Sequence, residues 1–395
     1  MGKLSWGKRC YAVLVLCATT GIAAPTQTFT TLVNLDGTNG AQPVVPLVQA
    51  TDGNFYGTTD EGGTYGYGTV FKIAPAGTLT TLHSFDGTDG SSLQAGLVQA
   101  TGGGNFYGTT STGGDLSCNA PYGCGTVFKV TPAGTLTTLH SFDGTDGSSP
   151  QAGLVQATDG SFYGTAAEGG HADCFFGDTC GTVFKITAGG TLTTLHFFDY
   201  TDGYYPVARL VQATDGNFYG TTYNGGDPTA CGPPCGNVFK MSPGGTLQTL
   251  HNFVFSDGAF PQGGLLQATN GTLYGTTPSG GANRDGTVFS LSVGLSPFVG
   301  TQPASGKVGA AVKILGTNLT GATSVSFNGT TAPFKVVSRS EITTVVPFGA
   351  TTGKVQVVMP WDTLSSNVNF QVEPPGFCPG RCFSPLSRSG DGRGN

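Results

Sequence analysis

The sequence predicts an all-β fold, a five-bladed β-propeller followed by an immunoglobulin-like β-sandwich, and two observations support it. First, the 395 residues include 66 glycines and only 10% charged side chains, whereas average usage is about 7% glycine and 25% charge. That balance disfavours long amphipathic helices, and the 37% apolar fraction excludes a disordered chain. Second, four short segments rich in β-branched and aromatic residues recur along the chain.

The repeat has four segments, each bounded by Gly, Asp, Asn or Pro, as is typical of strands. The first segment begins at Leu47, Leu97, Leu154, Leu210 and Leu265, in steps of 50 to 57 residues. The second begins at Phe55, Phe106, Phe162, Phe218 and Leu273, and the third at Gly68, Gly125, Gly181, Gly236 and Gly286. The fourth begins at Leu79, Leu136, Leu192 and Leu247. Four antiparallel strands in roughly 50 residues match the period of one propeller blade.

The fifth repeat lacks its fourth segment, and the missing copy stands at the front of the chain. Phe29-Thr30-Thr31-Leu32-Val33 matches Leu-Thr-Thr-Leu-His of the other repeats. We therefore expect the N-terminal strand to close the last blade by pairing Phe29 to Leu35 with Val288 to Leu291. Such closure would remove two exposed sheet edges.

Three further segments flank the repeats. Residues 1–24 have a basic start, an apolar run and small residues near a cleavage site, as a secretory signal peptide does. The propeller is expected over 25–293, and alternating runs over 295–372 predict a small β-sandwich. Residues 373–395 are rich in Pro, Gly and Arg, and we expect them to be disordered.

Both parts of the chain resemble known families. Gly-Thr-Val-Phe-Lys from Gly68 and Asp-Gly-Asn-Phe-Tyr-Gly-Thr from Asp52, with their repeats, resemble the GloVer tandem repeat of bacterial exported proteins that carry varied (choice-of-anchor) surface anchors. Residues 295–372 resemble an IPT/TIG domain, with Ser305-Gly306-Lys307-Val308-Gly309, Ile314 to Leu319 and Thr352-Gly353-Lys354-Val355. The resemblance to IPT/TIG domains implies that residues 295–372 form a spacer or an interaction module in a surface protein.

Eight cysteines outside the signal segment form four close pairs. In an exported protein such pairs predict disulfides. A zinc site would need four ligands that converge on one ion, and these spacings do not provide them. The predicted disulfides join Cys118 to Cys124, Cys174 to Cys180, Cys231 to Cys235, and Cys378 to Cys382.

The sequence offers no familiar catalytic motif, and we expect no metal and no cofactor. Calcium is disfavoured at the Asp-Gly-Thr-Asp-Gly connections that begin at Asp86 and Asp143, because two acids are too few for a closed shell of oxygens. Acidic residues outnumber basic ones, 23 to 17, so nucleic acid is not an expected partner. No catalytic residue is proposed, and the chain is expected not to be an enzyme.

Alternating strand direction places the loops between the second and third strands on the same face as the connections between blades. That face combines aromatic rings with carboxylates, which suits sugar recognition. The competing interpretation is that the aromatics pack under their own loops and the acids are turn residues. The candidate ligand-binding residues are Tyr65, Tyr67, Tyr122, Phe175, Phe176, Tyr200, Tyr204, Tyr205, Asp86, Asp89, Asp143 and Asp146.

The sequence thus favours a secreted or cell-surface binding protein, with a propeller face that recognises extracellular glycan. The alternative is a polysaccharide-acting enzyme, a glycoside hydrolase or lyase, with acids from loops such as Asp60-Glu61 or Glu168. A third hypothesis is a structural envelope component. The expected partner is an extracellular polysaccharide or a surface protein, and the chain is expected to be a monomer with no transmembrane segment after signal cleavage.

Overall fold

The computed structural model describes residues 28–101, 104–170, 174, 179–227, 229, 231 and 234–373. The predicted signal peptide, the predicted disordered tail, Phe175 and Phe176 lie outside the described residues. Cys378 and Cys382, the fourth predicted disulfide pair, lie outside them as well. Within the described residues the fold is all-β, apart from one 3-10 helix, η2 (Leu319–Gly321). The predicted fold class is therefore confirmed at the level of secondary structure.

The repeats form four four-stranded antiparallel sheets and one three-stranded sheet, called units 1 to 5 below. Unit 1 contains β1 (Val48–Gln49), β2 (Phe55–Thr59), β3 (Thr69–Ile73) and β4 (Leu79–Ser84). Unit 2 contains β5 (Val98–Gln99), β6 (Phe106–Thr110), β7 (Thr126–Val130) and β8 (Leu136–Ser141). Unit 3 contains β9 (Val155–Gln156), β10 (Phe162–Ala166), β11 (Thr182–Ile186) and β12 (Leu192–Phe197). Unit 4 contains β13 (Val211–Gln212), β14 (Phe218–Thr222), β15 (Asn237–Met241) and β16 (Leu247–Asn252). Unit 5 contains β17 (Leu266–Gln267), β18 (Leu273–Thr277) and β19 (Thr287–Leu291).

The repeated Phe-Tyr-Gly-Thr segment forms the second strand because its glycine leaves room for an aromatic ring. In unit 3, Gly164 of β10 pairs with Phe184 of β11. A Cβ atom on Gly164 would lie 2.6 Å from the Phe184 ring and 2.9 Å from Leu154, which is closer than van der Waals contact allows. The missing side chain therefore lets the ring of the third strand pack over the second.

The hydrophobic cores lie between units rather than within them. Tyr163 of unit 3 stacks on Phe218 of unit 4 with ring centroids 4.0 Å apart. Both rings belong to one buried cluster with Val183 of unit 3 and with Leu210 and Phe239 of unit 4. Each unit therefore depends on its neighbour to bury its faces, as stacked repeat architectures do.

The predicted closure of the last blade is absent from the described residues. Residues 28–40 contain no strand, and the sheet of unit 5 ends at β19. The N-terminal segment instead lies against unit 1, where a Cβ atom on Gly77 would be 2.9 Å from the Leu32 carbonyl oxygen. The sheets are consistent with propeller blades, but they form an open series in which Leu47 of unit 1 and Val288 of unit 5 are exposed, and β19 keeps a free sheet edge.

The second part of the chain is a β-sandwich. One sheet has the order β20 (Gly300–Gln302), β22 (Ala311–Leu315), β26 (Glu341–Val345), β25 (Phe334–Val336). The other has the order β24 (Thr330–Ala332), β23 (Ser324–Phe327), β27 (Val355–Val358), β28 (Thr363–Ser365). β21 (Ser305–Gly306) pairs in parallel with β29 (Gln371–Val372). Ile314, Val325, Phe327 and Ile342 contribute to the shared core.

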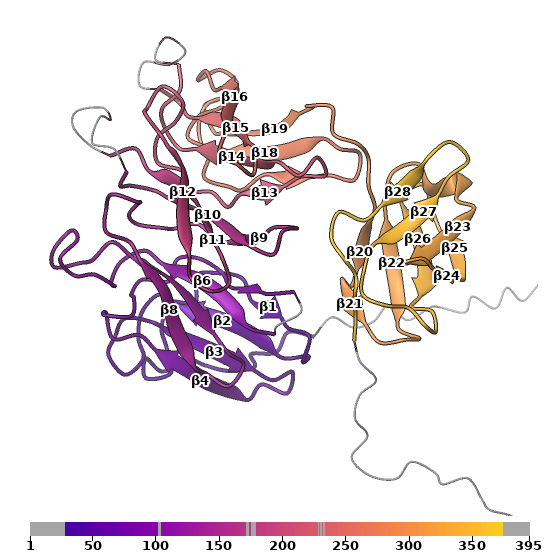
Figure 1. The fold of residues 1–395 in the computed structure, drawn as a ribbon, viewed down its shortest axis with the longest axis horizontal. Helices are drawn as coiled ribbons and strands as arrows, with labels where there is room; N and C mark the ends of the chain where they lie inside the picture. Colours follow the sequence, from indigo (N-terminus) through magenta and orange to yellow (C-terminus); the bar gives the residue numbers. More distant parts are fainter. Residues whose placement is uncertain are drawn as a thin grey trace, which may run out of the picture.

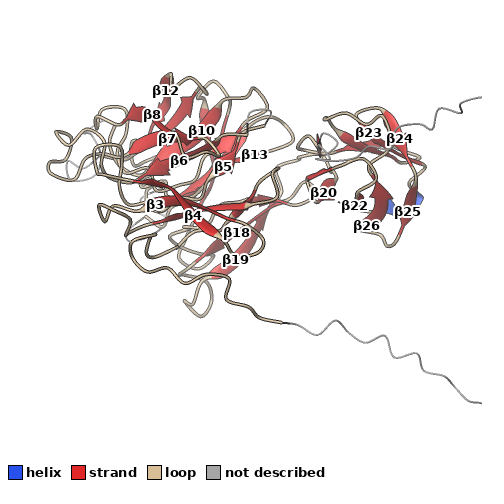
Figure 2. Cartoon of the chain, turned by 90° about the horizontal axis from the view of Figure 1, so that it is seen from below, coloured by secondary structure: helices blue, strands red, loops and turns tan. Residues whose placement is uncertain are grey.

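The units follow one another in an arc, from β1–β4 at one end to β17–β19 at the other (Figure 1). The first strands β1, β9 and β13 lie on the side of the arc toward the β-sandwich (Figure 1). Seen from below, the sandwich is a separate body joined to the units by a chain segment (Figure 2).

Candidate functional site

The connection into each unit lies beside the loop between the second and third strands of that unit. Isolated bridges join Ser91 to Thr112, Ser148 to Glu168 and Tyr204 to Asn224. The Tyr223 amide also donates to the Tyr205 carbonyl at 3.1 Å. The two kinds of loop therefore share one face of the array, and residues from several units meet there.

A cavity of about 470 Å³ opens on this face. Its lining comes from the connections into units 2 to 5 and from the loop that follows β14. It consists of Gln94, Gln151, Tyr205, Val207, Tyr223 and Gln262. We call the site formed by these six residues the axial cavity. It combines two phenol rings with three side-chain amides and contains no acidic residue.

The polar and aromatic groups of the axial cavity are held in place by one another. The Gln151 side-chain nitrogen donates to the Tyr205 hydroxyl at 3.1 Å and to the Ser149 hydroxyl at 3.2 Å. The Tyr205 and Tyr223 rings lie 6.2 Å apart at an angle of 69°, and Tyr223 is 5.3 Å from Phe260. These contacts hold the two tyrosine rings and the Gln151 amide at fixed positions, which lowers the entropic cost of binding a ligand.

Tyr205 stands on an unusual piece of backbone. It adopts a φ of 61°, and the equivalent Ser149 and Phe260 adopt 56° and 61°, a region that side-chain-bearing residues enter at a cost of about 1 to 3 kcal/mol. The Tyr205 amide donates to the carbonyl of Cys180 at 3.1 Å, and the Phe260 amide donates to that of Cys235 at 2.8 Å. The Ser149 amide likewise donates to the Cys124 carbonyl at 2.9 Å, so one cysteine of each of the three observed disulfides bonds a residue at or beside the axial cavity.

Three of the four predicted disulfides are present in the described residues, Cys118–Cys124, Cys174–Cys180 and Cys231–Cys235. This confirms the pairing drawn from their spacing. The fourth, between Cys378 and Cys382, falls outside the described residues and stays a prediction. Disulfides of this kind are typical of chains that fold in an oxidising compartment.

The predicted aromatic residues divide into two groups. Tyr65, Tyr67 and Tyr122 are exposed and do not line the axial cavity. Tyr200, Tyr204 and Tyr205 form a continuous run, with ring centroids 6.1 Å and 5.7 Å apart. Of the predicted residues within the described part of the chain, Tyr205 alone lines the axial cavity.

The predicted acids are engaged in their own loops. Asp86 accepts the Thr88 amide and hydroxyl at 2.9 and 2.7 Å, and Asp89 lies 2.6 Å from the His83 ring. Asp143 and Asp146 make the same contacts with Thr145 and His140. These contacts fit the interpretation of turn residues, and they also give the repeated histidines a partner within each connection.

The Asp turns should make the fold sensitive to strong acid. The pKa of Asp86 lies below its ordinary value, chiefly because the Thr88 hydroxyl donates to the carboxylate, with help from the backbone amides of Thr88 and Asp89. The pKa of Asp143 is lowered in the same way, chiefly by the Thr145 hydroxyl. Because a lowered folded-state pKa stabilises only the ionised form, this stabilisation is present above the unfolded pKa of about 3.9 and is lost as pH falls further.

We therefore expect the urea midpoint of unfolding to fall as the pH drops below about 4. Thr88→Val with Thr145→Val should reduce that acid-dependent loss, because the carboxylates lose the hydroxyl donors named above. Identical pH slopes for the double variant and the unmodified chain would contradict this explanation.

Side-chain amides on the first strands bind the preceding unit. The side-chain oxygens of Gln99, Gln156 and Gln212 accept backbone amides of Thr51, Thr101 and Thr158 at 3.1, 2.8 and 2.9 Å. Gln267 accepts the Thr214 amide at 3.1 Å. These glutamines therefore connect neighbouring units rather than forming a ligand site.

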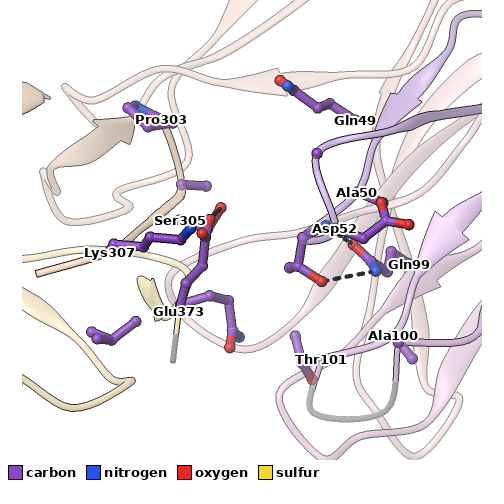
Figure 3. A pocket seen from close by; sticks show the side chains of 16 residues that line it. Gln49, Ala50, Asp52, Gln99, Ala100, Thr101, Pro303, Ser305, Lys307 and Glu373 are labelled. Atoms are coloured by element: carbon purple, nitrogen blue, oxygen red, sulfur yellow. Dashed lines mark hydrogen bonds between the residues drawn. The ribbon is translucent and has the colours of Figure 1, made fainter. Parts of the chain in front are cut away.

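A second cavity, of about 990 Å³, separates units 1 and 2 from the β-sandwich. Gln49, Asp52 and Gln99 line one side of it, and Ser305, Lys307 and Glu373 line the other (Figure 3). Asp52 accepts the Tyr56 hydroxyl at 2.8 Å and a side-chain N–H of Asn54 at 2.9 Å. Because this lining contains no aromatic ring, it offers no stacking surface for a sugar.

Sequence reasoning missed Tyr223 and the three glutamines of the axial cavity. A signal for the glutamines was present, because Gln94, Gln151 and Gln262 each stand three residues before the leucine that begins a repeat. Tyr223 had no such signal, since the equivalent positions hold Asp60, Ser111, Ala167 and Pro278.

The described residues contain neither a cluster of metal-ligating side chains nor a helix of membrane-spanning length. No group of three or more His, Cys, Asp or Glu side chains gathers there in a way that would hold a metal ion. Across the same residues, no helix has the length and apolar character needed to cross a membrane.

The comparisons with known proteins agree with both resemblances. The model of the Gloeobacter/Verrucomicrobia repeat matches residues 21–120 and 116–331, and the model of the IPT/TIG domain matches residues 298–372. No curated protein matches the chain.

Solved structures give distant matches. A fungal alcohol oxidase of the AA5 family, in complex with copper, is 15% identical, with 82% of this chain and 74% of that chain covered at a TM-score of 0.41. A gluconolactonase from Xanthomonas campestris is 12% identical, with 78% and 99% covered at a TM-score of 0.34.

Proposed function

Because the chain belongs to the Gloeobacter/Verrucomicrobia repeat family and carries an IPT/TIG domain, we propose that it is a secreted or cell-surface protein that binds extracellular glycan. The repeat units supply the recognition face, and the β-sandwich acts as a spacer. Both kinds of module are those of surface or interaction proteins, and the disulfides fit an exported chain.

The observation that supports glycan recognition is the composition of the axial cavity. Tyr205 and Tyr223 offer ring faces on which the flat side of a pyranose can stack. Gln94 and Gln262 offer amides that can both donate to and accept from sugar hydroxyls. Gln151 offers its amide oxygen as an acceptor, because its two N–H groups already bond Tyr205 and Ser149. An uncharged lining of this kind favours a neutral polysaccharide over a strongly charged one.

Binding without cleavage follows from the same lining. Glycoside hydrolysis needs two carboxylates held about 5 to 10 Å apart, and none of the six lining residues is acidic. Asp60, one of the loop acids that the enzyme hypothesis invoked, accepts the Ser92 hydroxyl at 2.9 Å.

We expect the purified chain to be retained by at least one member of a panel of cell-wall and plant polysaccharides, without release of reducing ends. Tyr223→Ala should weaken that retention by about tenfold or more. Stacking on an aromatic ring is worth roughly 0.5 to 1.5 kcal/mol beyond the apolar area that it buries, and about 1.4 kcal/mol is a factor of ten in affinity. Tyr205→Ala should have a similar effect.

Tyr122→Ala is the matched control, because this tyrosine is exposed and lies outside the axial cavity. Its retention should equal that of the unmodified chain. Equal losses for Tyr122→Ala and Tyr223→Ala would remove the axial cavity from the proposal, and new reducing ends would favour the enzyme instead.

A further inference from the structure

The chain makes one interface four times, between each unit and the next. Its most regular contact is a tyrosine of the second strand stacked on an aromatic ring of the following unit. Tyr56 meets Phe106, Tyr107 meets Phe162 and Tyr163 meets Phe218, each at 4.0 Å between ring centroids. We call the tyrosine side of a unit its front face and the opposite side its back face.

The front face of unit 5 is uncovered. Tyr274 occupies the position of Tyr163 and is 37% exposed, whereas Tyr163 is fully buried. Val288 occupies the position of Val183 and is 80% exposed, against 0% for Val183. The β-sandwich contacts unit 5 at Thr269. The Thr269 hydroxyl shares a hydrogen bond with the Thr317 hydroxyl, and the Thr269 carbonyl accepts the Phe298 amide. These contacts leave the front face of unit 5 open.

The back face of unit 1 is the complementary half. Leu47 is 50% exposed, whereas the equivalent Leu154 is 1% exposed in the interface between units 2 and 3. The side chain of Gln49 also has no unit before it to bind. It makes no hydrogen bond within the described residues, whereas the Gln99 side-chain oxygen accepts the Thr51 amide of the preceding unit.

Leu32 already lies where the last strand of a preceding unit would lie. A Cβ atom on Gly77 would be 2.9 Å from the Leu32 carbonyl oxygen, and one on the equivalent Gly134 would be 2.6 Å from the carbonyl oxygen of Leu82 in β4. Leu32 therefore occupies the place relative to unit 1 that β4 occupies relative to unit 2. This segment lies on unit 1, but it has no sheet partner and forms no strand within the described residues.

We propose that a second copy of this chain supplies the missing partner, so that copies associate head to tail. The front face of unit 5 receives the back face of unit 1 of the next copy, and residues 29–33 of that copy pair with β19. The contact is heterologous, because two different surfaces meet, and it adds a fourth strand to a free sheet edge.

The pairing register follows from the other units. Val70 pairs with His83 and Val183 pairs with His196. In the repeat Val288 corresponds to Val70, and Val33 corresponds to His83. Val288 of one copy should therefore lie opposite Val33 of the next, at the Cβ separation of about 4.5 to 5.5 Å that is typical of such pairs.

The test is the double variant Val33→Cys with Val288→Cys in the full chain, oxidised and separated by non-reducing electrophoresis. Head-to-tail association predicts a ladder of covalent oligomers that collapses on reduction. A cross-linked monomer would overturn the proposal, because it would mean that the chain closes on itself. The absence of any cross-link would overturn it as well.

The single variants Val33→Cys and Val288→Cys are the controls, and neither should form oligomers beyond the background of the unmodified chain. A covalent dimer from Val288→Cys alone would indicate a head-to-head contact and would contradict the proposed geometry. Unchanged urea midpoints for all variants would show that the substitutions leave the units folded.

Light scattering of the untagged chain provides a second readout. The unmodified chain should show a mass that rises with concentration, and Val288→Lys should weaken association by at least about tenfold, because it places a charge in an apolar contact. Val337→Lys, at a valine 53% exposed in the β-sandwich, should leave association unchanged. A constant monomer mass for the unmodified chain would overturn the proposal.

Discussion

Tyr163→Ala should lower the free energy of unfolding by about 3 to 5 kcal/mol, the range for removing a large buried aromatic side chain. The ring is fully buried between units 3 and 4 and stacks on Phe218 at 4.0 Å. Its hydroxyl also donates to Asp159 at 3.2 Å. Urea unfolding followed by circular dichroism measures the change.

The repeat provides the control at the equivalent position of unit 5. Tyr274→Ala should lower the free energy of unfolding by no more than about 1.5 kcal/mol, because this ring is 37% exposed. The measurement is made at a concentration too low for association. Equal losses for Tyr163→Ala and Tyr274→Ala would show that the interfaces between units do not stabilise the fold as described.

Gly147→Ala should also destabilise the protein strongly, by several kcal/mol or by preventing folding. Gly147 precedes the bridge at Ser148 and adopts a φ of 140°, which a side chain rarely allows. A Cβ atom there would lie 2.7 Å from both the Ala166 Cβ and the Thr182 hydroxyl oxygen. Backbone strain and steric overlap therefore act together.

Gly160→Ala separates these two causes. Gly160 has a φ of 82° in the turn between β9 and β10, yet no atom lies within 4 Å of the position that an added Cβ atom would take. Only the backbone strain remains, so Gly160→Ala should lower the free energy of unfolding by about 1 to 2 kcal/mol. A cost for Gly160→Ala equal to that for Gly147→Ala would contradict the role assigned to the steric contacts.

Local features of the fold could be predicted from the sequence because each depends on nearby residues. The Phe-Tyr-Gly-Thr strands, the Asp-Gly turns and the pairing of Cys118 with Cys124 require only short-range contacts. The segment Phe29 to Val33 matches the fourth strands in sequence, and its Leu32 contacts unit 1 as Leu82 of β4 contacts unit 2. It forms no strand within the described residues, so the predicted pairing is wrong there.

Closure could not be predicted, because it depends on small rotations between units added over the whole array. The sequence shows that Phe29 to Val33 resembles a fourth strand, but not whether β19 reaches it. Val288 of β19 is 80% exposed, so Phe29 to Val33 do not cover it.

The axial cavity depends on distances that the repeat pattern does not contain. Tyr205 belonged to the predicted aromatic set, yet its neighbour Tyr223 stands in a different strand connection, and Gln94 and Gln262 come from other units. Only the packing of successive units brings these side chains together. The predicted carboxylates lie on the same connections but are held by Thr and His within each loop.

The axial cavity is the proposed glycan-binding site. The most direct measurement is a crystal structure of the chain with an oligosaccharide cut from the polysaccharide that retains it best. We expect a sugar ring stacked on Tyr205 or Tyr223, with hydroxyls bonded to the amides of Gln151 or Gln262. Sugar density elsewhere, for example between Asp52 and Lys307, with none at the axial cavity, would contradict it.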